Sequence, residues 1–310
     1  MLHRQLFLVA ALGQLIAART VSPVLPGADA GQEKSVAQSQ QEEGKKVLDL
    51  QLVCTKIRGP LPLDPHDKAW TTAKELTVKL IPQTVQEPKL LQPSIETVRA
   101  RALNDAGWIA VRLEWSDSTP DVTLRSDRFG DAAAVEFPMK DSPMPDFRMG
   151  NDDNPVHLLL WRADRQMAKY TGKTFLELNY PRAVSDVPVQ TPRAKESGKG
   201  NSPAADDSAA KSAGNHGVPG TAPVIEELNA ATWNQMTVQK QQHARGAGQH
   251  VDGRWHVVFA RPLASGDAND ATLASNRPAL IAFGVWDGGR QNAASRKMVS
   301  EGWVWLKIER

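Results

Sequence analysis

The stretch of sequence that decides the fold is Ile109-Ala-Val-Arg-Leu-Glu-Trp115. A large apolar side chain stands at every second position, and small or charged side chains stand between them. Successive side chains of a strand point to opposite faces of its sheet, so this period of two is typical of a strand. The stretch therefore predicts a half-buried strand whose core-facing residues are Ile109, Val111, Leu113 and Trp115.

Similar short runs recur along the chain, with Gly, Pro, Asp and Asn between them. They span residues 48–54, 132–137, 156–161, 175–178, 255–259, 280–286 and 304–308. No long stripe of apolar residues at helical spacing accompanies them. Many short strands of this kind predict an all-β fold, an antiparallel β-sandwich with short helices or loops.

Two polar stretches interrupt the pattern of strands. Residues 31–46 are rich in Gln, Glu and Lys, and residues 193–223 are rich in Ala, Ser, Gly, Asp and Lys. Neither contains enough apolar surface to offset the entropy lost on ordering. We expect the first to be a mobile leader and the second a flexible, disordered insertion within one domain, residues 47–310, because predicted strands lie on both sides of it. A domain boundary at the second stretch is the alternative.

Residues 1–30 have the pattern of an export signal. His3 and Arg4 precede the apolar run 6–18, and Ala28-Asp-Ala30 supplies small residues for cleavage before Gly31. The run is shorter than the roughly 20 residues that a membrane-spanning helix needs, and an uncleaved anchor is the alternative. These features predict a periplasmic or otherwise exported protein whose mature chain has no transmembrane span.

Charge and cysteine content exclude several classes of function. The 310 residues include 37 Lys and Arg and 35 Asp and Glu, and this near balance argues against nucleic acid as a partner. Cys54 is the only cysteine, so this chain alone forms no intramolecular disulfide, Cys-based zinc site, iron–sulfur cluster or covalent c-type haem. Its alternation with Leu48, Leu50 and Leu52 predicts a buried strand position.

Two segments carry a more specific pattern. Met149 stands in Pro145-Asp-Phe-Arg-Met-Gly-Asn-Asp-Asp-Asn-Pro-Val156. Lys297 follows Val285-Trp-Asp-Gly288 and a polar loop, and it precedes Val299-Ser-Glu-Gly-Trp303. Together with residues 62–70, 111–121, 128–138, 156–163 and 255–263, in this order, they give the chain a clear likeness. It resembles the haem b-binding gamma subunit shared by ethylbenzene dehydrogenase, dimethylsulfide dehydrogenase, chlorate and selenate reductases and nitrite oxidoreductase.

This resemblance implies a non-catalytic electron-transfer subunit that binds a non-covalent haem b, with Met149 and Lys297 as the axial ligands of the iron. It also implies a complex with a molybdenum-pterin catalytic subunit and an iron–sulfur subunit, and a soluble cytochrome as electron carrier. The sequence lacks Ser/His/Asp, zinc-protease and phosphate-loop signatures, which agrees with a non-catalytic role. Asn151 stands where many relatives carry Asp, a departure that alters the turn and leaves the sulfur ligand unchanged. The substrate of the parent complex stays open.

A lysine ligand makes chemical demands on its surroundings. The amine is protonated near neutral pH at its reference pKa of about 10.4, so it binds iron only where burial and competition by the metal free its lone pair. Met139 and Met144 lie in the same short segment as Met149, and Met139 is the alternative methionine ligand. His157 and His256 are the next candidates, as bis-His or His–Lys ligation, and both are expected opposite the core-facing residues of their strands.

Other residues near the two segments are candidates for contacts with the porphyrin. Haem propionates are usually met by cationic side chains or N–H donors at the rim of a pocket. The arginines next to the proposed ligands in the sequence are Arg148, Arg162 and Arg296. The aromatic candidates for packing on the ring, each with an ordinary core position as the alternative, are Trp115, Trp161 and Trp286.

Two rival functions compete with the haem subunit. Nine Trp residues could supply stacking platforms for a carbohydrate-binding β-sandwich module. A structural subunit that has lost its haem is the third interpretation. Colour discriminates between them, because a haem-loaded chain is red with a Soret band and a sugar-binding module is colourless.

Overall fold

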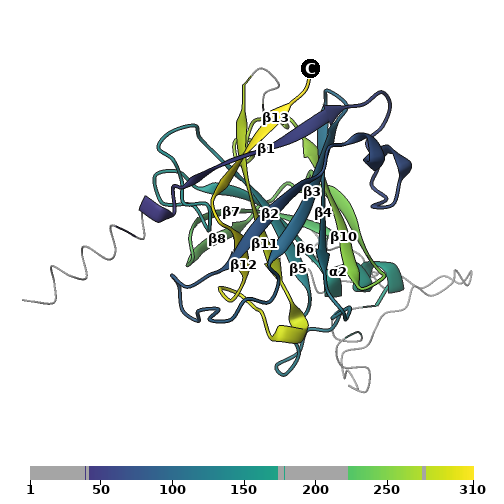
Figure 1. Cartoon of the computed structure of the whole chain (residues 1–310), viewed down its shortest axis with the longest axis vertical. Coiled ribbons are helices and arrows are strands. Elements are labelled where there is room, and N and C mark those ends of the chain that lie inside the picture. Colours follow the sequence, from purple (N-terminus) through teal and green to yellow (C-terminus); the bar gives the residue numbers. More distant parts are fainter. Residues whose placement is uncertain (1–38, 40–41, 174–177, 179–222, 274–276) are drawn as a thin grey trace, which may run out of the picture. The chain divides into compact units, whose positions relative to one another are not determined.

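The computed structural model describes residues 39, 42–173, 178, 223–273 and 277–310 (Figure 1). The chain divides into two compact units, residues 1–39 and 40–310, and the second contains all of the strands reported below. The predicted signal 1–30, residues 175–177 of the predicted strand 175–178 and nearly all of the insertion 193–223 lie outside the described residues. Leu178, the last residue of that predicted strand, is helical. Among the described helices, none has the length and apolar character needed to cross a membrane.

Strands dominate the described part of the chain. They are β1 (Val47–Lys56), β2 (Leu76–Pro82), β3 (Thr97–Asn104), β4 (Trp108–Ser116), β5 (Ala132–Pro138), β6 (Val156–Arg162), β7 (Ile225–Thr232), β8 (Gln235–Val238), β9 (Arg245–Val251), β10 (Arg254–Pro262), β11 (Ala279–Trp286), β12 (Met298–Ser300) and β13 (Trp303–Ile308). The short helices are η1 (Lys68–Thr72), α2 (Ala163–Thr171) and η2 (Gly288–Arg290). The predicted all-β class with short helices is confirmed.

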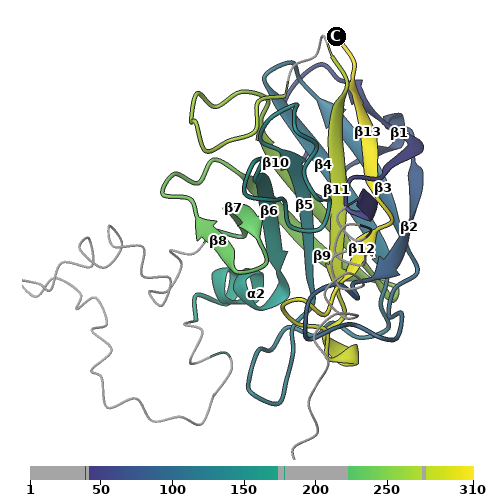
Figure 2. The same cartoon turned by 90° about the vertical axis from the view of Figure 1, so that its left-hand side faces the viewer.

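Neighbouring strands pair in the order β8-β7-β6-β5-β11-β12-β2-β3-β4-β10-β9. All of these pairs are antiparallel. The exception to the predicted antiparallel arrangement is β1, which runs parallel to both β3 and β13. This path has two halves, β8-β7-β6-β5-β11-β12 and β2-β3-β4-β10-β9. Because β13 pairs with β11 and β1 pairs with β3, the pair of β1 and β13 forms a second connection between these halves (Figure 2).

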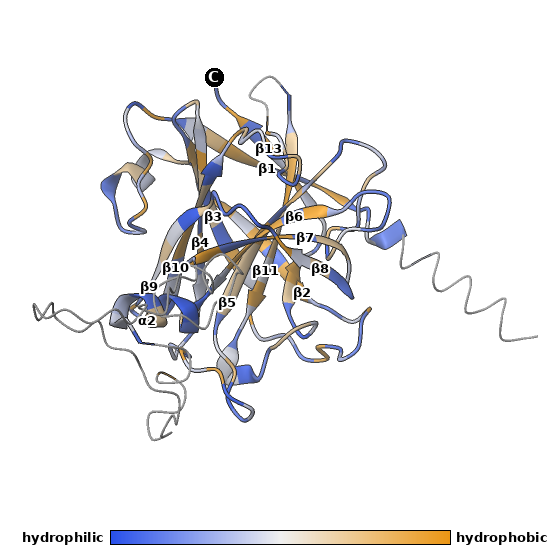
Figure 3. Ribbon diagram, turned by 180° about the vertical axis from the view of Figure 1, so that it is seen from behind, coloured by the Kyte–Doolittle hydropathy of each residue, from blue (hydrophilic) through white to orange (hydrophobic). Residues whose placement is uncertain are grey.

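The core lies between the faces of these two halves. The indole rings of Trp115 on β4 and Trp161 on β6 are 6.2 Å apart, although their strands are not neighbours in a sheet. Trp255 on β10 packs against Trp161 at 4.8 Å, so the two layers meet through aromatic side chains. Hydrophobic residues gather in the central strands and hydrophilic ones in the connecting loops (Figure 3). Burial of this apolar face is the main stabilising term of such a sandwich.

The strand β4 differs in one respect from the prediction. Its inner residues are buried as expected, but Ala110 and Glu114 on the outer face are 0% and 7% exposed. The outer face is covered because Trp70 of η1 packs on Ala110 and Leu103. The strand is therefore buried on both faces, and the expectation of a half-buried strand was wrong.

The end of the predicted leader is bonded to the domain. The carbonyl of Gly44 accepts a hydrogen bond from the amide of Phe147 at 2.9 Å, and the carbonyl of Lys46 accepts one from the amide of Trp303 at 2.8 Å. Lys46 also forms an ion pair with Glu301 at 3.1 Å. The boundary between leader and domain thus lies a few residues before β1.

Candidate functional site

A cavity of about 480 Å³ lies over the outer face of β5, β6 and β7. This volume falls within the range of about 300–1,000 Å³ that is usual for small-molecule sites. Its floor is apolar and consists of Leu158 and Leu160 on β6 and Leu228 on β7. Met236 on β8 and Trp286 at the end of β11 also line the cavity. Lining residues from loops include Gln86, Pro88, Leu124, Gly130, Trp233, Asn292, Ala294 and Ser295. Met149 and Lys297 both line this cavity.

A tight turn before β6 positions Met149. The carboxylate of Asp146 accepts a hydrogen bond from the amide of Arg148 at 2.9 Å, and the carbonyl of Asp146 accepts one from the amide of Gly150 at 2.8 Å. Gly150 has φ +69°, and a Cβ there would lie 2.6 Å from the carbonyl oxygen of Ala230. Only glycine suits this position, because it needs both a left-handed backbone and room for a neighbouring carbonyl.

The turn is anchored by the fully buried amide of Asn154. Its Nδ2 donates hydrogen bonds to the carbonyls of Lys140 and Pro143 at 2.8 and 2.7 Å. Its Oδ1 accepts one from the amide of Lys140 at 3.0 Å. These bonds fasten the two ends of the loop between β5 and β6 to each other, and this loop carries Met149.

The loop between β11 and β12 positions Lys297, which is 3% exposed. The indole Nε1 of Trp286 donates to the carbonyl of Ala294 at 2.9 Å. Gln83 bridges the end of the loop: its Nε2 donates to the carbonyl of Ser295 at 2.8 Å, and its amide donates to the carbonyl of Lys297 at 2.9 Å. These hydrogen bonds fix the backbone from which the side chain of Lys297 extends into the domain.

The two proposed ligands meet inside the protein. The Nζ of Lys297 donates hydrogen bonds to the Sδ of Met149 at 3.2 Å and to the carbonyl of Arg148 at 2.9 Å. It also lies 5.1 Å from the ring centre of Trp233 and 5.4 Å from that of Trp286. Burial lowers the pKa of Lys297 from its usual value, and the carboxylate of Glu136 opposes this effect. The arrangement supplies an amine and a thioether side by side at the wall of an apolar cavity.

Glu136 is a site residue that the sequence did not reveal. It lies on β5, is 5% exposed, and burial raises its pKa to about 8 while Lys297 acts in the opposite direction. The run 132–137 predicted only a strand, because its other members are apolar. A single carboxyl in the middle of an apolar strand was the signal that could have identified it.

The other candidate residues lie elsewhere or act differently. The sulfur of Met139 accepts a hydrogen bond from Nδ2 of Asn229 at 3.6 Å. Met144 packs against the hydrophobic cluster that includes Phe147 and Met149. Neither methionine lines the cavity. Trp115 and Trp161 belong to the core, whereas Trp286 lines the cavity.

Of the three arginines, Arg162 alone lines the cavity, where it pairs with Asp164 at 2.7 Å. The guanidinium of Arg148 pairs with Asp146 at 2.5 Å. That of Arg296 lies 5.6 Å from the ring centre of Phe129. Arg162 is therefore the best placed of the three to meet an anionic group in the cavity.

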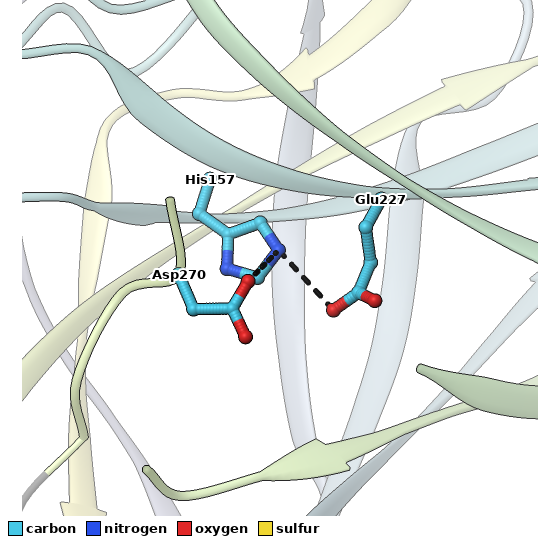
Figure 4. Close-up of side chains that lie close together, drawn as sticks. All are labelled: His157, Glu227 and Asp270. Atoms are coloured by element: carbon cyan, nitrogen blue, oxygen red, sulfur yellow. Dashed lines mark ion pairs between the residues drawn. The ribbon is translucent and has the colours of Figure 1, made fainter. Parts of the chain in front are cut away.

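His157 lies on the face of β6 that also carries Leu159 and Trp161, so the expectation that it lies opposite the core was wrong. Its Nε2 is 3.4 Å from Oε1 of Glu227 and 3.6 Å from Oδ1 of Asp270 (Figure 4). The amide of Ala271 donates to its Nδ1 at 3.2 Å, which places the proton of the neutral ring on Nε2. The ring therefore contacts the two carboxylates and lies on the face of β6 opposite the cavity.

His256 lies on the outer face of β10, as predicted. Its Nδ1 is 2.8 Å from Nη2 of Arg112, and its ring centre is 4.6 Å from that of His66. Burial and the charge of Arg112 lower the pKa of His256 to about 4. It is remote from the cavity in the fold, because β10 belongs to the opposite half of the sandwich.

Comparisons with known proteins extend these observations. The sequence model of a family described as ethylbenzene dehydrogenase matches residues 67–298. A protein of Haloferax mediterranei named "Putative respiratory nitrate reductase heme subunit ORF7" is 27% identical over 77% of this chain, and the match spans 66%, just under two thirds, of that protein. The gamma subunit of dimethylsulfide dehydrogenase from Rhodovulum sulfidophilum is 24% identical over 97% of this chain and 94% of its own length.

A third relative is the gamma subunit of chlorate reductase from Ideonella dechloratans, which is 24% identical over 81% of this chain and 82% of its own. Among solved structures, a family 9 carbohydrate-binding module from Caldicellulosiruptor kristjanssonii aligns with a TM-score of 0.40 at 8% identity. That alignment covers 84% of this chain and 93% of the module.

Proposed function

Because the chain belongs to the ethylbenzene dehydrogenase family, we propose that it is an electron-transfer subunit that binds haem b in the cavity, with Met149 and Lys297 as the two axial ligands. The observation that carries this proposal is the contact between Nζ of Lys297 and Sδ of Met149, 3.2 Å apart at the cavity wall. Two strong ligands leave iron without an open position for substrate, which suits electron transfer and not catalysis.

The donor set and the surroundings fit such a group. The floor formed by Leu158, Leu160 and Leu228 suits an apolar ring, and Arg162 at the wall suits an anionic edge. When bound, haem supplies a centre that accepts and releases one electron. The protein contributes the identity of both ligands, their orientation and the exclusion of water.

Lys297 must lose its proton to bind iron, and its surroundings assist that loss. Burial disfavours the charged amine and lowers its pKa. The carboxyl of Glu136, whose pKa burial raises to about 8, is the acidic group that acts on the amine most strongly. Glu136 can hold a proton in this apolar space when Lys297 is neutral, so the buried pair need not carry two charges.

The relatives' names support a place in a larger assembly. Two of them are gamma subunits of dehydrogenase and reductase complexes, and a third is named as a heme subunit. We propose that this chain is likewise non-catalytic and joins a molybdenum-pterin catalytic subunit and an iron–sulfur subunit outside the cytoplasm. A soluble cytochrome is the proposed carrier that exchanges electrons with the haem.

Ligand substitution tests the axial pair. Lys297→Ala should convert a low-spin, six-coordinate haem into a high-spin or water-ligated one, whereas Met149→His should keep it low-spin and lower its potential, because imidazole is a harder donor than a thioether. Absorption and electron paramagnetic resonance spectra of the purified chain report both changes. Met139→Ala is the control and should change neither spectrum nor potential.

Three outcomes would contradict the proposal. An unaltered low-spin spectrum in Lys297→Ala would exclude the lysine as a ligand. A spectrum disturbed only by Met139→Ala would exclude Met149. A mature chain that is colourless and shows no Soret band after haem is supplied would remove the electron-transfer role and leave a sugar-binding or structural one.

A further inference from the structure

Three aspartates from distant parts of the sequence meet beside the cavity. Asp117 follows β4, Asp131 precedes β5, and Asp287 follows β11. One carboxylate oxygen from each lies within 4.8 Å of the others. Asp131 is fully buried, Asp117 is 6% exposed, and Asp287 is half-buried.

Most of these carboxylate oxygens accept hydrogen bonds; Oδ1 of Asp287, for example, accepts one from the amide of Arg290 at 3.0 Å. Asp131 accepts hydrogen bonds from the amides of Gly288 and Asp121 at 2.8 and 2.7 Å and from Nε1 of Trp255 at 2.9 Å. Oδ1 of Asp117 accepts one from the amide of Thr119 at 3.1 Å. Oδ2 of Asp117 is buried without a hydrogen-bond partner. A buried carboxylate oxygen without a donor is costly unless a cation or a proton meets it.

The charges around this cluster do not balance. Within the described residues, no Lys or Arg forms an ion pair with Asp117, Asp131 or Asp287. Asp121 adds a further negative charge near Asp117 and Asp287, and Arg290 acts on Asp287 in the opposite direction. Three carboxylates this close repel one another strongly in a partly buried site.

The cluster around His157 offers a contrast. There the guanidinium of Arg261, which is 1% exposed, lies 4.0 Å from the carboxylate of Asp270, and His243 lies 3.2 Å from it. Two carboxylates thus have an arginine and two histidines as neighbours, and Nε2 of His157 bears the ring proton. That cluster contains a buried arginine that pairs with one of its carboxylates, whereas no Lys or Arg among the described residues pairs with the three aspartates.

We propose that Asp117, Asp131 and Asp287 bind one Ca²⁺ ion. Calcium prefers oxygen ligands at about 2.3–2.6 Å, so ligands of one ion lie no more than about 5 Å apart, as the three carboxylates do. The cluster offers no nitrogen or sulfur donor, which argues against zinc and other transition metals. The unpartnered Oδ2 of Asp117 supplies a free ligand atom.

The position of the ion would connect two loops that wall the cavity. The loop after Asp117 leads to Gly130 and Ala132, and the loop after Asp287 leads to Asn292 and Ser295, all of which line the cavity. A cation bound by both loops would fix their positions relative to each other. The Ca²⁺ site is separate from the proposed haem ligands, so either proposal can fail without the other.

The competing explanation is a proton in place of the ion. Burial and the charge of Asp117 raise the pKa of Asp131 to about 8, so a proton shared between these two carboxyls would also relieve their repulsion. A shared proton requires no added cation, and this difference makes the two explanations separable by measurement.

Calorimetry on the mature, haem-loaded protein tests the proposal. After treatment with EGTA and its removal, titration with CaCl₂ should show one ion bound per chain, and the melting temperature should rise when Ca²⁺ is restored. Absence of both binding and a thermal response at neutral pH would overturn the proposal in favour of the shared proton. The Soret band recorded on the same samples reports haem binding independently.

Asp117→Asn locates the ion, since it removes one charge and keeps an acceptor for the amide of Thr119. It should weaken Ca²⁺ binding at least about tenfold, which corresponds to about 1.4 kcal/mol. Asp49→Asn, at an exposed position of β1, is the matched control and should bind as the unaltered chain does. Unchanged affinity in Asp117→Asn would place the ion elsewhere and overturn the assignment.

Discussion

At the scale of single residues, Gly150 determines where the sulfur of Met149 lies. The residue combines a left-handed backbone with close approach of the carbonyl of Ala230, and it follows the proposed ligand directly. A side chain there would push the turn away from β7, and Met149 would move with it. The position of Met149 relative to Lys297 thus depends on the absence of a Cβ atom at residue 150.

Gly150→Ala should destabilise the domain by about 2–4 kcal/mol, because it adds the cost of a left-handed backbone to that of a clash with a carbonyl. Gly172→Ala is the matched control, because Gly172 has φ +65° and a Cβ added there would meet nothing within 4 Å. That control should cost only about 1–2 kcal/mol. Urea unfolding measures both, and equal losses in the two variants would show that the contact with Ala230 is unimportant.

His256 should make stability depend on pH. Its folded pKa of about 4 lies below its ordinary value of 6.5, so the unfolded chain binds a proton that the folded chain refuses between these two pH values. The contribution of the neutral ring is complete above pH 6.5 and is lost as pH falls from 6.5 to about 4. The loss should reach about 1–3 kcal/mol at pH 4.

His256→Asn isolates this effect, since its amide oxygen can still accept from Arg112 but does not titrate. Unfolding curves at pH 7 and pH 4 should differ less in the variant than in the unaltered chain. The same difference in both proteins would show that other groups cause the pH dependence.

At the scale of elements, the sequence predicted many of the strands that carry large apolar side chains at every second position. It missed β2, in which Leu76, Val78 and Leu80 alternate with polar residues, and also β3, β8 and β12. Seven predicted strands correspond to β1, β4, β5, β6, β10, β11 and β13. The pattern missed β7, in which Glu226 and Glu227 are buried, because a charged residue in a strand normally indicates an exposed face. It also missed β9, where Gly246 and Gly248 replace the expected apolar residues.

For the candidate site, the sequence identified the two proposed ligands only through a family resemblance. Nothing in the composition of the loops indicated that Met149 and Lys297 would come within 3.2 Å, because their segments are brought together by the pairing of β5 with β6 and β11. Glu136, Trp233 and the three aspartates required the structure, since contacts between distant segments have no local signature.

The glycines of β9 have a packing reason that leads to a prediction. A Cβ at Gly248 would lie 2.6 Å from the indole of Trp161, which itself bonds to Gln166 at 2.8 Å. Gly248→Ala should therefore cost about 1–3 kcal/mol through overpacking. Gly284→Ala in β11 is the control, because its nearest contact would be 3.5 Å, and it should be neutral or stabilising by up to about 1 kcal/mol. Thermal unfolding compares them, and a tolerated alanine at 248 would contradict the packing argument.

At the scale of the whole domain, β13 joins segments that are far apart in the sequence. It pairs with β1 on one side and β11 on the other, and Trp303, Val304 and Leu306 are fully buried. Because β1 also pairs with β3, these strands complete a second connection between the two halves of the sandwich. Loss of β13 would uncover β1 and open the core along its length.

Removal of residues 303–310 should therefore abolish cooperative unfolding, and near-ultraviolet circular dichroism with a thermal scan would detect the loss of fixed tertiary packing. Deletion of Arg310 alone, an exposed residue, should leave the transition unchanged. A truncated chain that still melts in one sharp transition would show that β1 is held by β3 without help.

The parallel pairing of β1 with β13 also affects how the protein is made. A ribosome that adds about 5–20 residues per second needs about 10–50 s to synthesise the roughly 250 residues between these strands. During that time β1 has emerged, but the edge that β13 will cover remains open, with Leu52 and Cys54 next to it. An open edge with apolar neighbours invites pairing with other chains. The nascent polypeptide should therefore depend on chaperones that shield it until β13 arrives.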